Sequence, residues 1–370
     1  MRIAFDIAAL HPGGAERQTL EVASGLSDAG HDVLIIVNKR AEYFAEYFDR
    51  VPIIELHRTS RWDLRVVPDI RRALRAFEAD VCVCVMFNAS LWGRLAAASL
   101  GCRAVVAEHS TNARTSLASR LTNVLLRAGT ETVIACAEAQ VEPLVRGGHQ
   151  KRKIRVVRNG VSVRRFARDD REAAKMRREL DVPPEAAVVM LVAAHRVEKR
   201  HDRFVSLIER LHDGGTRAWG LMVGGGPLLE KTVALAKASP VSEWLRVTGP
   251  IENMPAAYSA ADVVLLVSDD VETFPLSFLE AQACEVPVVG MDTGGVRETL
   301  IEGQTGFVVE QGDLEAMASV TVALLSDQGW RTSIGRAGRA FVEEHLSTDA
   351  MIDGYASVLT QSGKGGRKRP

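Results

Sequence analysis

Two glutamates eight residues apart are the first candidates for chemistry in this chain. Glu272 and Glu280 lie in ETFPLSFLEAQAC, residues 272–284, and Glu280 is the only charged residue between Phe274 and Cys284. A carboxylate in such an apolar run needs hydrogen-bond donors, because burying it without them is costly. Ribose or sugar hydroxyls would supply them. A partner arginine or backbone N–H for Glu280, and a favourable place beside a helix N-terminus for Glu272, are the structural alternatives.

Three cations crowd a loop nearer the N-terminus. Arg196, Lys199 and Arg200 lie in AAHRVEKRHD, between an apolar run and a helical segment. The start of a helix carries partial positive charge, so cations gathered there are unfavourable unless an anion is bound. The planar fork of arginine and the compact ammonium of lysine suit a diphosphate. A solvated basic loop is the structural alternative.

Glycine-rich turns follow three other apolar runs, at Gly13–Gly14, Gly224–Gly226 and Gly294–Gly295. Each lets the backbone approach a ligand closely, and the helix expected after it directs free N–H groups toward an anion. Turns that need glycine for geometry alone would have the same sequence. The first turn is not the GxGxxG of dinucleotide-binding proteins. His109, in EHSTN, also follows an apolar run, where a ligand-facing and a structural histidine are both plausible.

Short apolar runs that alternate with helical stretches supply the elements that must position these residues. Continuously apolar strands separated by helices are typical of parallel sheets covered on both faces. In the first half we predict strands over Arg2–Ala8, Asp32–Val37, Ile53–Leu56, Val81–Met86, Ala104–Glu108, Val133–Cys136 and Ile154–Val157. In the second half we predict Ala187–Ala194, Gly220–Val223, Leu245–Thr248, Val263–Val267, Val286–Gly290 and Gly306–Val309.

A charged stretch without a strand, residues 161–185, separates the two halves. A chain of 370 residues also exceeds one ordinary core. We therefore predict two doubly wound α/β domains, at 1–162 and 163–345, a C-terminal helix over 346–361 that crosses back to the first domain, and a disordered basic tail over 362–370. Such domains bind ligands at the carboxyl ends of their strands, so the ligand of a tandem pair is expected between them.

Composition is that of a globular protein, with 46% hydrophobic and 25% charged residues. A net charge of −1 gives no indication of a nucleic-acid partner. The five cysteines lie mostly in apolar runs without a CxxC, which indicates buried free thiols in a reducing compartment. The N-terminal residues run directly into a strand, and no apolar run reaches about 18 residues. We therefore expect a cytoplasmic protein without signal peptide or transmembrane helix.

Residues 114–128, RTSLASRLTNVLLRA, have the pattern of a basic amphipathic helix. The apolar set is Leu117, Leu121, Val124, Leu125 and Ala128, and Arg114, Arg120 and Arg127 line another side. The leucines either pack on the sheet, with the arginines in water, or lie on an anionic bilayer. The tail adds a second basic patch that would favour peripheral association with the inner membrane face, at Lys364, Arg367, Lys368 and Arg369.

In their order along the chain, these motifs resemble those of retaining glycosyltransferases of family 4, which have the GT-B fold. The matching segments are GGAER at 13–17, NGV at 159–161, Arg196 with Lys199, VGGGP at 223–227, and ETFPLSFLEAQACEVPVV with the following TGGVRE. The last carries the family's E-x(7)-E signature. The resemblance covers most of the chain and is most specific in the C-terminal half. It implies two Rossmann-like domains with a cleft between them.

The resemblance also implies a function: transfer of a hexose from a nucleoside diphosphate sugar to an acceptor hydroxyl, with retention, in glycan, polysaccharide or glycolipid synthesis. Glu280 would bind the ribose and Glu272 the transferred sugar, while Arg196 and Lys199 would neutralise the diphosphate. His109 would stand near the reacting sugar. Further donor contacts are implied at Gly14, Gly225, Thr273, Phe274, Leu276 and Gly295. The acceptor would be a glycan or a lipid-linked molecule.

The chain departs from the family pattern in places. The spacing from Arg196 to Lys199 is shorter than usual, so Arg200 is an alternative to Lys199, and Gly225 stands where an aspartate is common. Because the fold needs no DxD-like motif, Asp269–Asp270 is interpreted as a solvated loop pair, and no metal or cofactor is expected. Two other functions stay open: a non-catalytic nucleotide-sugar-binding relative, and a nucleotide-sugar 2-epimerase of the same fold.

Overall fold

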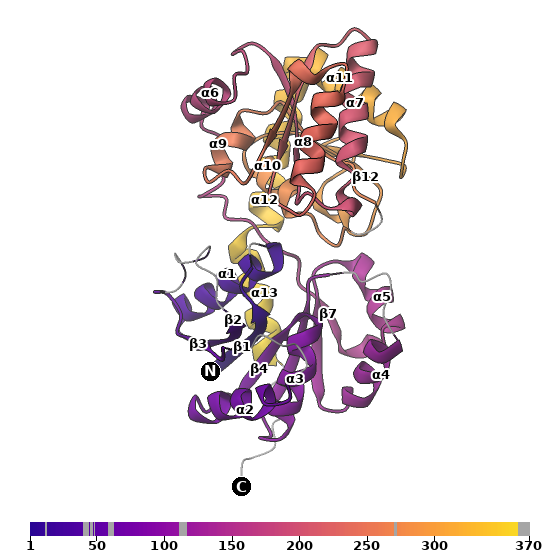
Figure 1. Cartoon of the computed structure of the whole chain (residues 1–370). Helices are drawn as coiled ribbons and strands as arrows, with labels where there is room; N and C mark the ends of the chain where they lie inside the picture. Colours follow the sequence, from indigo (N-terminus) through magenta and orange to yellow (C-terminus); the bar gives the residue numbers. More distant parts are fainter. Residues whose placement is uncertain are drawn as a thin grey trace. The chain divides into compact units, whose positions relative to one another are not determined.

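The computed structural model of the chain describes residues 1–11, 13–39, 44, 47, 49–57, 63–110, 117–269 and 272–361. The chain divides into two compact units. Unit 1 comprises Met1–Gly160 and the segment that begins at Thr348, and unit 2 comprises Val161–Ser347. Each unit is built around its own parallel sheet flanked by helices (Figure 1). The predicted fold class, two doubly wound α/β domains, is confirmed.

The sheet of unit 1 has the strand order β3-β2-β1-β4-β5-β6-β7, and every pairing is parallel. Its strands are β1 (Arg2–Ala9), β2 (Asp32–Lys39), β3 (Ile53–Glu55), β4 (Val81–Val85), β5 (Arg103–Glu108), β6 (Thr130–Ala135) and β7 (Ile154–Val156). The helices are α1 (Gly14–Asp28), α2 (Val66–Ala76), α3 (Met86–Ala98), α4 (Leu117–Leu126), α5 (Val141–Arg146) and α13 (Thr348–Gln361), with the 3-10 turns η2 (Glu138–Gln140) and η3 (Lys151–Lys153).

The strands of unit 1 are continuously apolar because alternate side chains enter different core layers. On β1, Ile3 and Phe5 pack in one layer, whereas Ala4 packs in another. Helix α13 contributes to the first of these layers with Met351, Tyr355 and Leu359, and it lies against α1 (Figure 1). The C-terminal helix is thus part of the core of unit 1, although more than 180 residues of unit 2 precede it.

The sheet of unit 2 has the order β10-β9-β8-β11-β12-β13, again parallel. Its strands are β8 (Ala187–Val192), β9 (Ala218–Val223), β10 (Leu245–Thr248), β11 (Val263–Leu266), β12 (Val288–Met291) and β13 (Gly306–Val309). The helices are α6 (Asp170–Glu179), α7 (His201–Asp213), α8 (Leu229–Ala238), α9 (Met254–Ser259), α10 (Leu276–Ala283), α11 (Leu314–Ser326) and α12 (Gln328–His345), with the 3-10 turns η4 (Val197–Lys199), η5 (Ser242–Trp244) and η6 (Val296–Thr299).

The two places where the chain passes between the units lie side by side. Val161 and Ser347 form an isolated bridge, and the N–H of Val161 donates to the carbonyl of Leu346 at 2.9 Å. The units divide at 160/161 and 347/348, against the predicted 162/163 and 345/346. The charged stretch after Val161 contains helix α6 and, where described, no strand. The predicted tail, 362–370, lies outside the described residues, as does Arg114.

All five cysteines are free thiols, and Cys102 is the only one of them that is not buried. No helix in the described part of the chain is long and apolar enough to cross a membrane.

Candidate active site

Helix α10 carries the lone carboxylate of Glu280 in its second turn, with 5% of the side chain exposed. The hydroxyl of Tyr258, on α9, donates to its Oε2 at 2.7 Å. Tyr258 is itself fully buried, so its hydroxyl needs an acceptor inside the protein. The carboxylate therefore has a protein donor, and its burial alone does not require a ribose. Sequence reasoning missed Tyr258. The only indication was general: the hydroxyl of a tyrosine that becomes buried needs a hydrogen-bond acceptor.

Glu272 lies in the loop before α10 and is also buried. It forms an ion pair with Lys199, the last residue of η4, across 73 positions of sequence. The carboxylate comes from the loop after β11 and the ammonium from the loop after β8, and these two strands are neighbours in the sheet. The structure thus brings together two residues that the sequence assigned separately, to the sugar and to the diphosphate. Thr273 and Phe274, next in the chain, are buried.

The Gly294–Gly295 turn is explained by contact with this loop. A Cβ on Gly294 would lie 1.5 Å from the carbonyl oxygen of Glu272, and its φ of +52° also favours glycine. The N–H of Gly295 donates to the same carbonyl at 3.2 Å. This N–H is thus engaged by the protein itself, and the donor contact predicted at Gly295 stays a prediction. The turn holds the backbone of Glu272 in place through this hydrogen bond and the close packing of Gly294.

Arg196 lies just after β8 with an exposed side chain and no ion-pair partner among the described residues. A cavity of about 300 Å³ opens beside it, lined also by the first turns of α7 and α8. Arg200 lines the same cavity, and its guanidinium bonds Asp202 at 2.7 Å and Asp269 at 3.1 Å. Its role as an alternative to Lys199 stays a prediction. These two carboxylates raise the pKa of Arg200.

Asp269 and Asp270 were predicted to be a solvated loop pair, and for Asp269 this prediction is wrong, because its carboxylate is held by ion pairs. Asp269 accepts ion pairs from Arg200 and from Arg203, the latter at 2.9 Å, and its N–H donates to the carbonyl of Glu198. Asp269 therefore connects the loop after β11 to the start of α7 through these ion pairs. Asp270 lies outside the described residues.

A buried histidine, His195, joins the loops after β8 and β9. Its Nδ1 lies 3.0 Å from Oγ1 of Thr232, and its ring stacks on His201 with centroids 4.1 Å apart. Its N–H donates to Gly225, and its carbonyl accepts from Leu228 at 2.9 Å. Burial lowers the pKa of His195, which keeps the ring neutral beside the cations. Sequence reasoning missed this residue; its place before Arg196 was the only signal.

The VGGGP glycines meet protein backbone rather than open space. A Cβ on Gly226 would come within 2.7 Å of the backbone of His195, and one on Gly224 within 2.1 Å of the carbonyl of Ala193. Both have φ near +147°, which disfavours other residues. A Cβ on Gly225 would lie 3.2 Å from Pro250. Their first role is to pack the β8 and β9 loops together, so the donor contact predicted at Gly225 stays a prediction.

Two helix starts that were predicted to contact the donor have no side-chain cap at the residue before them. Helix α10 begins at Leu276 after Pro275, and α1 begins at Gly14 after Gly13. The first N–H groups of a helix have no partner within it and attract anions. Leu276 and Gly14 are the first residues of these helices, as the predicted donor contacts require, and the contacts themselves stay predictions.

In unit 1, His109 follows the end of β5, as expected. Burial lowers the pKa of His109 to about 4, and a hydrogen bond with the Asn159 side chain partly offsets this effect. Its Nδ1 is buried without a partner among the described residues. Gln18 of α1 bonds both the N–H and the carbonyl of Gly160, each at 3.0 Å, and so fixes the turn that carries Asn159. A neutral imidazole therefore stands at the carboxyl edge of this sheet.

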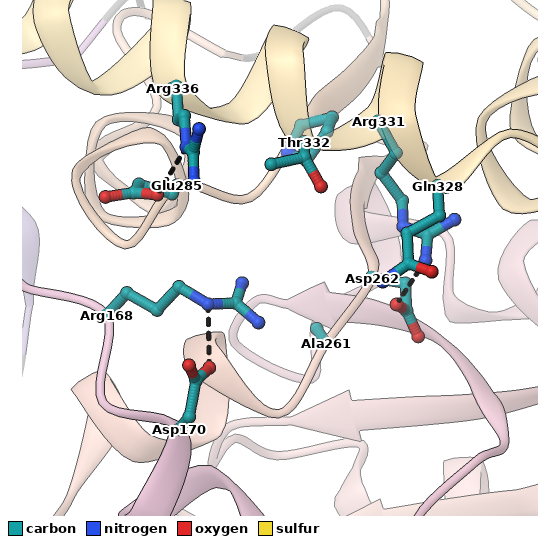
Figure 2. Close-up of a pocket in the computed structure, with 10 residues that line it drawn as sticks. Arg168, Asp170, Ala261, Asp262, Glu285, Gln328, Arg331, Thr332 and Arg336 are labelled. Carbon is teal, nitrogen blue, oxygen red and sulfur yellow. Dashed lines mark hydrogen bonds and ion pairs between the residues drawn. The ribbon is translucent and has the colours of Figure 1, made fainter.

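A second cavity of about 330 Å³ lies at the opposite edge of the unit 2 sheet (Figure 2). Its walls come from the segments before β11 and β12, the start of α6 and one face of α12. Each arginine in it faces an acid: Arg168 faces Asp170 at 2.8 Å, Arg331 faces Asp262 at 3.2 Å and Arg336 faces Glu285 at 3.9 Å. This charge-balanced cavity contains none of the predicted site residues.

Comparison with protein families matches nearly the whole chain. Residues 172–341 match the model described as glycosyl transferases group 1, and residues 12–165 match the model described as glycosyltransferase family 4. The chain belongs to the group 1 and family 4 glycosyltransferases. The two matched segments correspond to units 2 and 1, so both halves of the molecule are family domains.

Among proteins of similar sequence is the GDP-mannose-dependent alpha-(1-6)-phosphatidylinositol monomannoside mannosyltransferase of Mycolicibacterium smegmatis. It is 34% identical over 188 residues, 49% of each chain. The D-inositol 3-phosphate glycosyltransferase of Xylanimonas cellulosilytica is 31% identical over 247 residues, 62% of this chain and 58% of the relative. The chain spans about half the length of these relatives.

Solved glycosyltransferases share the fold over nearly the full length. A glycosyltransferase from Rickettsia africae superposes with a TM-score of 0.86 at 22% identity, covering 98% of each chain. HepE of Anabaena in complex with UDP has the same TM-score at 19% identity, covering 98% of this chain and 100% of HepE. At these identities the comparison establishes the architecture of this family member.

Proposed function

We propose that this family member transfers a hexose from a nucleoside diphosphate sugar to an acceptor hydroxyl, with retention of configuration. The observation that carries the proposal is the partly buried Lys199–Glu272 pair beside the exposed Arg196. All three come from loops after adjacent parallel strands, the edge where such sheets bind ligands. Family membership supports the reaction class, and the relatives above are named for phosphatidylinositol monomannoside and for D-inositol 3-phosphate.

The charges suit a leaving diphosphate. As the bond from the anomeric carbon to the diphosphate breaks, negative charge grows on the departing oxygen. Arg196 and Lys199 would stabilise this charge, together with the N–H groups at the start of α10. Glu272 would then accept hydrogen bonds from the hydroxyls of the transferred sugar. The acceptor oxygen would attack on the face that the diphosphate leaves, and the acceptor proton would pass to the leaving phosphate.

Glu280 and His109 complete the proposal. Glu280, with one oxygen held by Tyr258, would accept a hydrogen bond from the ribose. His109, neutral because burial lowers its pKa to about 4, would hydrogen-bond the sugar without adding charge. We propose a glycan or a glycolipid as acceptor, and no metal or cofactor, since the cations supply the charge that a metal would otherwise provide.

The test is turnover with a donor found by thermal-shift screening of UDP, GDP and ADP sugars, since a bound donor raises the unfolding temperature. Arg196→Ala should lower turnover about 100-fold or more, the usual effect of removing one donor to a developing oxyanion. Because Arg196 is exposed, the unfolding temperature should stay unchanged. Chelation of divalent metals should leave turnover unchanged. Arg336→Ala, an exposed arginine at the opposite cavity, is the matched control.

The same assay separates the alternatives. A non-catalytic relative would bind a donor but neither transfer nor hydrolyse it, and a 2-epimerase would convert the donor without an acceptor. Unchanged turnover in Arg196→Ala would remove this residue from the site.

A further inference from the structure

Helix α4 of unit 1 is amphipathic, but it is docked on the protein by a polar side chain. Asn123 is buried, its amide donates to the carbonyl of Gly147 at 3.0 Å, and its oxygen accepts from the buried Arg94 at 2.8 Å. A Cβ on Gly148 would lie 2.8 Å from the carbonyl of Arg120, so the turn after α5 packs closely against the helix. The inner side of α4 thus combines this hydrogen-bonded contact with Val124, whose Cγ2 would lie 3.1 Å from the same Cβ.

The leucines of α4 face water instead. Leu117, Leu121 and Leu125 follow one another at intervals of four, which places them in one stripe along the helix. Their exposed fractions are 71%, 53% and 78%. The interpretation that these leucines pack on the sheet is therefore wrong. Single exposed leucines are ordinary, but a contiguous apolar stripe on a monomer marks an interaction surface.

The surroundings of this stripe are basic. Arg120 and Arg127 are exposed on and just after the helix, with no acid between residues 117 and 130. The 3-10 turn η3 lies at the end of α4, where Lys153 donates to the carbonyl of Arg127 at 2.8 Å. Residues 117–155 contain seven Lys or Arg and three acids, a net charge of +4 in a chain whose total is −1. The stripe is thus an apolar surface with a cationic border.

We propose that Leu117, Leu121 and Leu125 enter the interface of an anionic phospholipid bilayer, with Arg120, Arg127 and η3 at the headgroups. A helix that lies in the membrane plane combines this arrangement of apolar and basic faces, and anionic headgroups attract the cations. A second copy of the chain suits the surface less well, because pairing two stripes would bring their arginines together. The inference goes beyond the proposed function, since it needs neither a donor nor catalysis.

The test is co-sedimentation of the full chain with vesicles. Vesicles of equal parts phosphatidylglycerol and phosphatidylcholine should pellet the protein at low salt, and phosphatidylcholine alone should not. Raising the salt from about 0.01 M to about 1 M, which shortens the Debye length from about 30 Å to about 3 Å, should weaken pelleting. The triple variant Leu117→Ser, Leu121→Ser, Leu125→Ser and the double variant Arg120→Glu, Arg127→Glu should each reduce the bound fraction at least about tenfold.

Matched controls come from the same unit. Leu64→Ser removes another leucine that is 69% exposed, and Arg71→Glu with Arg75→Glu reverses two exposed charges on α2. Both controls should pellet like the parent, and all variants should keep the parent's unfolding temperature and donor thermal shift. The proposal is overturned if the parent does not pellet, if the α4 variants pellet like the parent, or if the stripe is needed only for self-association in sedimentation velocity. Loss of vesicle binding with intact donor turnover would leave the proposed function standing.

Discussion

At the scale of single residues, Glu280 has a protein partner and a proposed ligand at once. One carboxylate oxygen accepts the Tyr258 hydroxyl, so the group is fixed in place before any donor arrives. Preorganisation of this kind lowers the cost of binding, because the side chain loses no further freedom when the ribose is bound.

Glu280→Ala should therefore weaken donor binding about tenfold or more, equivalent to about 1.4 kcal/mol, measured by titration calorimetry. It should also cost about 1–3 kcal/mol of stability, because the Tyr258 hydroxyl is left buried without its acceptor. Tyr258→Phe separates the two effects, since it removes the internal hydrogen bond but keeps the carboxylate. If Glu280→Ala binds donor like the parent, the ribose role is wrong.

Asp6 is a residue that the site does not use. It lies in the middle of β1, almost fully buried, and its Oδ2 has no partner among the described residues. Burial raises its pKa from 3.8 to about 8. Between these two values the folded protein keeps a proton that the unfolded chain has lost. Stability from this group is therefore fully present below about pH 3.8 and is lost as the pH rises through 8.

Asp6→Asn should remove this dependence. The free energy of unfolding of the parent should fall by up to about 1.4 kcal/mol per pH unit from this one proton, and the slope in the variant should be smaller by that amount. Urea unfolding at several values between pH 5 and 8 measures it. Equal slopes in parent and variant would show that Asp6 is ionised in the folded state.

At the scale of elements, the loops after β8, β9, β11 and β12 of unit 2 hold one another in place. The turn after β9 packs on His195, and the turn after β12 packs on the carbonyl of Glu272. Arg196 is adjacent to the first contact and Lys199 pairs with the residue in the second. The position of the cations thus depends on glycines that need not touch a ligand.

Gly226→Ala tests this dependence. The new methyl group would lie 2.7 Å from the backbone of His195 at a φ of +147°, so unit 2 should lose about 1–3 kcal/mol or more. Donor affinity should fall too, because the loop that carries Arg196 must move. Gly249→Ala has open space at its Cβ and should be nearly neutral in the same urea and calorimetric measurements. Similar losses in both variants would contradict the argument.

At the scale of the whole molecule, the C-terminal helix ties the end of the chain to unit 1. Met351, Tyr355 and Leu359 of α13 are at most 3% exposed and belong to the core that includes β1 and α1. This packing joins residues that are more than 300 positions apart in sequence. Unit 1 therefore cannot complete its core until unit 2 has been synthesised.

Removal of residues 348–370 should destabilise unit 1 selectively. Three buried side chains of this size contribute about 1.5–3 kcal/mol each, a large share of the stability of a domain. Scanning calorimetry should then show a transition for unit 2 near its parent temperature and a lower or absent one for unit 1. A uniform shift of both transitions would argue that the units unfold as one.

Much of the architecture could be predicted from the sequence. Each strand in the described ranges overlaps a predicted one, because a strand buried on both faces of a parallel sheet requires a continuous apolar run. The boundary could be predicted near Val163, two residues from the division at 160/161, because the alternation of strands and helices stops there. The family motifs placed Arg196, Lys199, Glu272 and Glu280 in loops or helix starts at one edge, since each follows such a run.

Only the tertiary structure decided which side chains meet. Local sequence could not pair Glu272 with Lys199 or Glu280 with Tyr258, because those contacts depend on the order of strands in the sheet. Nor could it show that Arg200 is held by acids, or that Gly295 bonds the carbonyl of Glu272. The periodicity of residues 117–126 predicted an apolar stripe on helix α4, but it could not show whether the stripe faces the protein core or solvent. A stripe of leucines is equally regular facing the core or water, and the hydrogen bonds of Asn123 turn it outward.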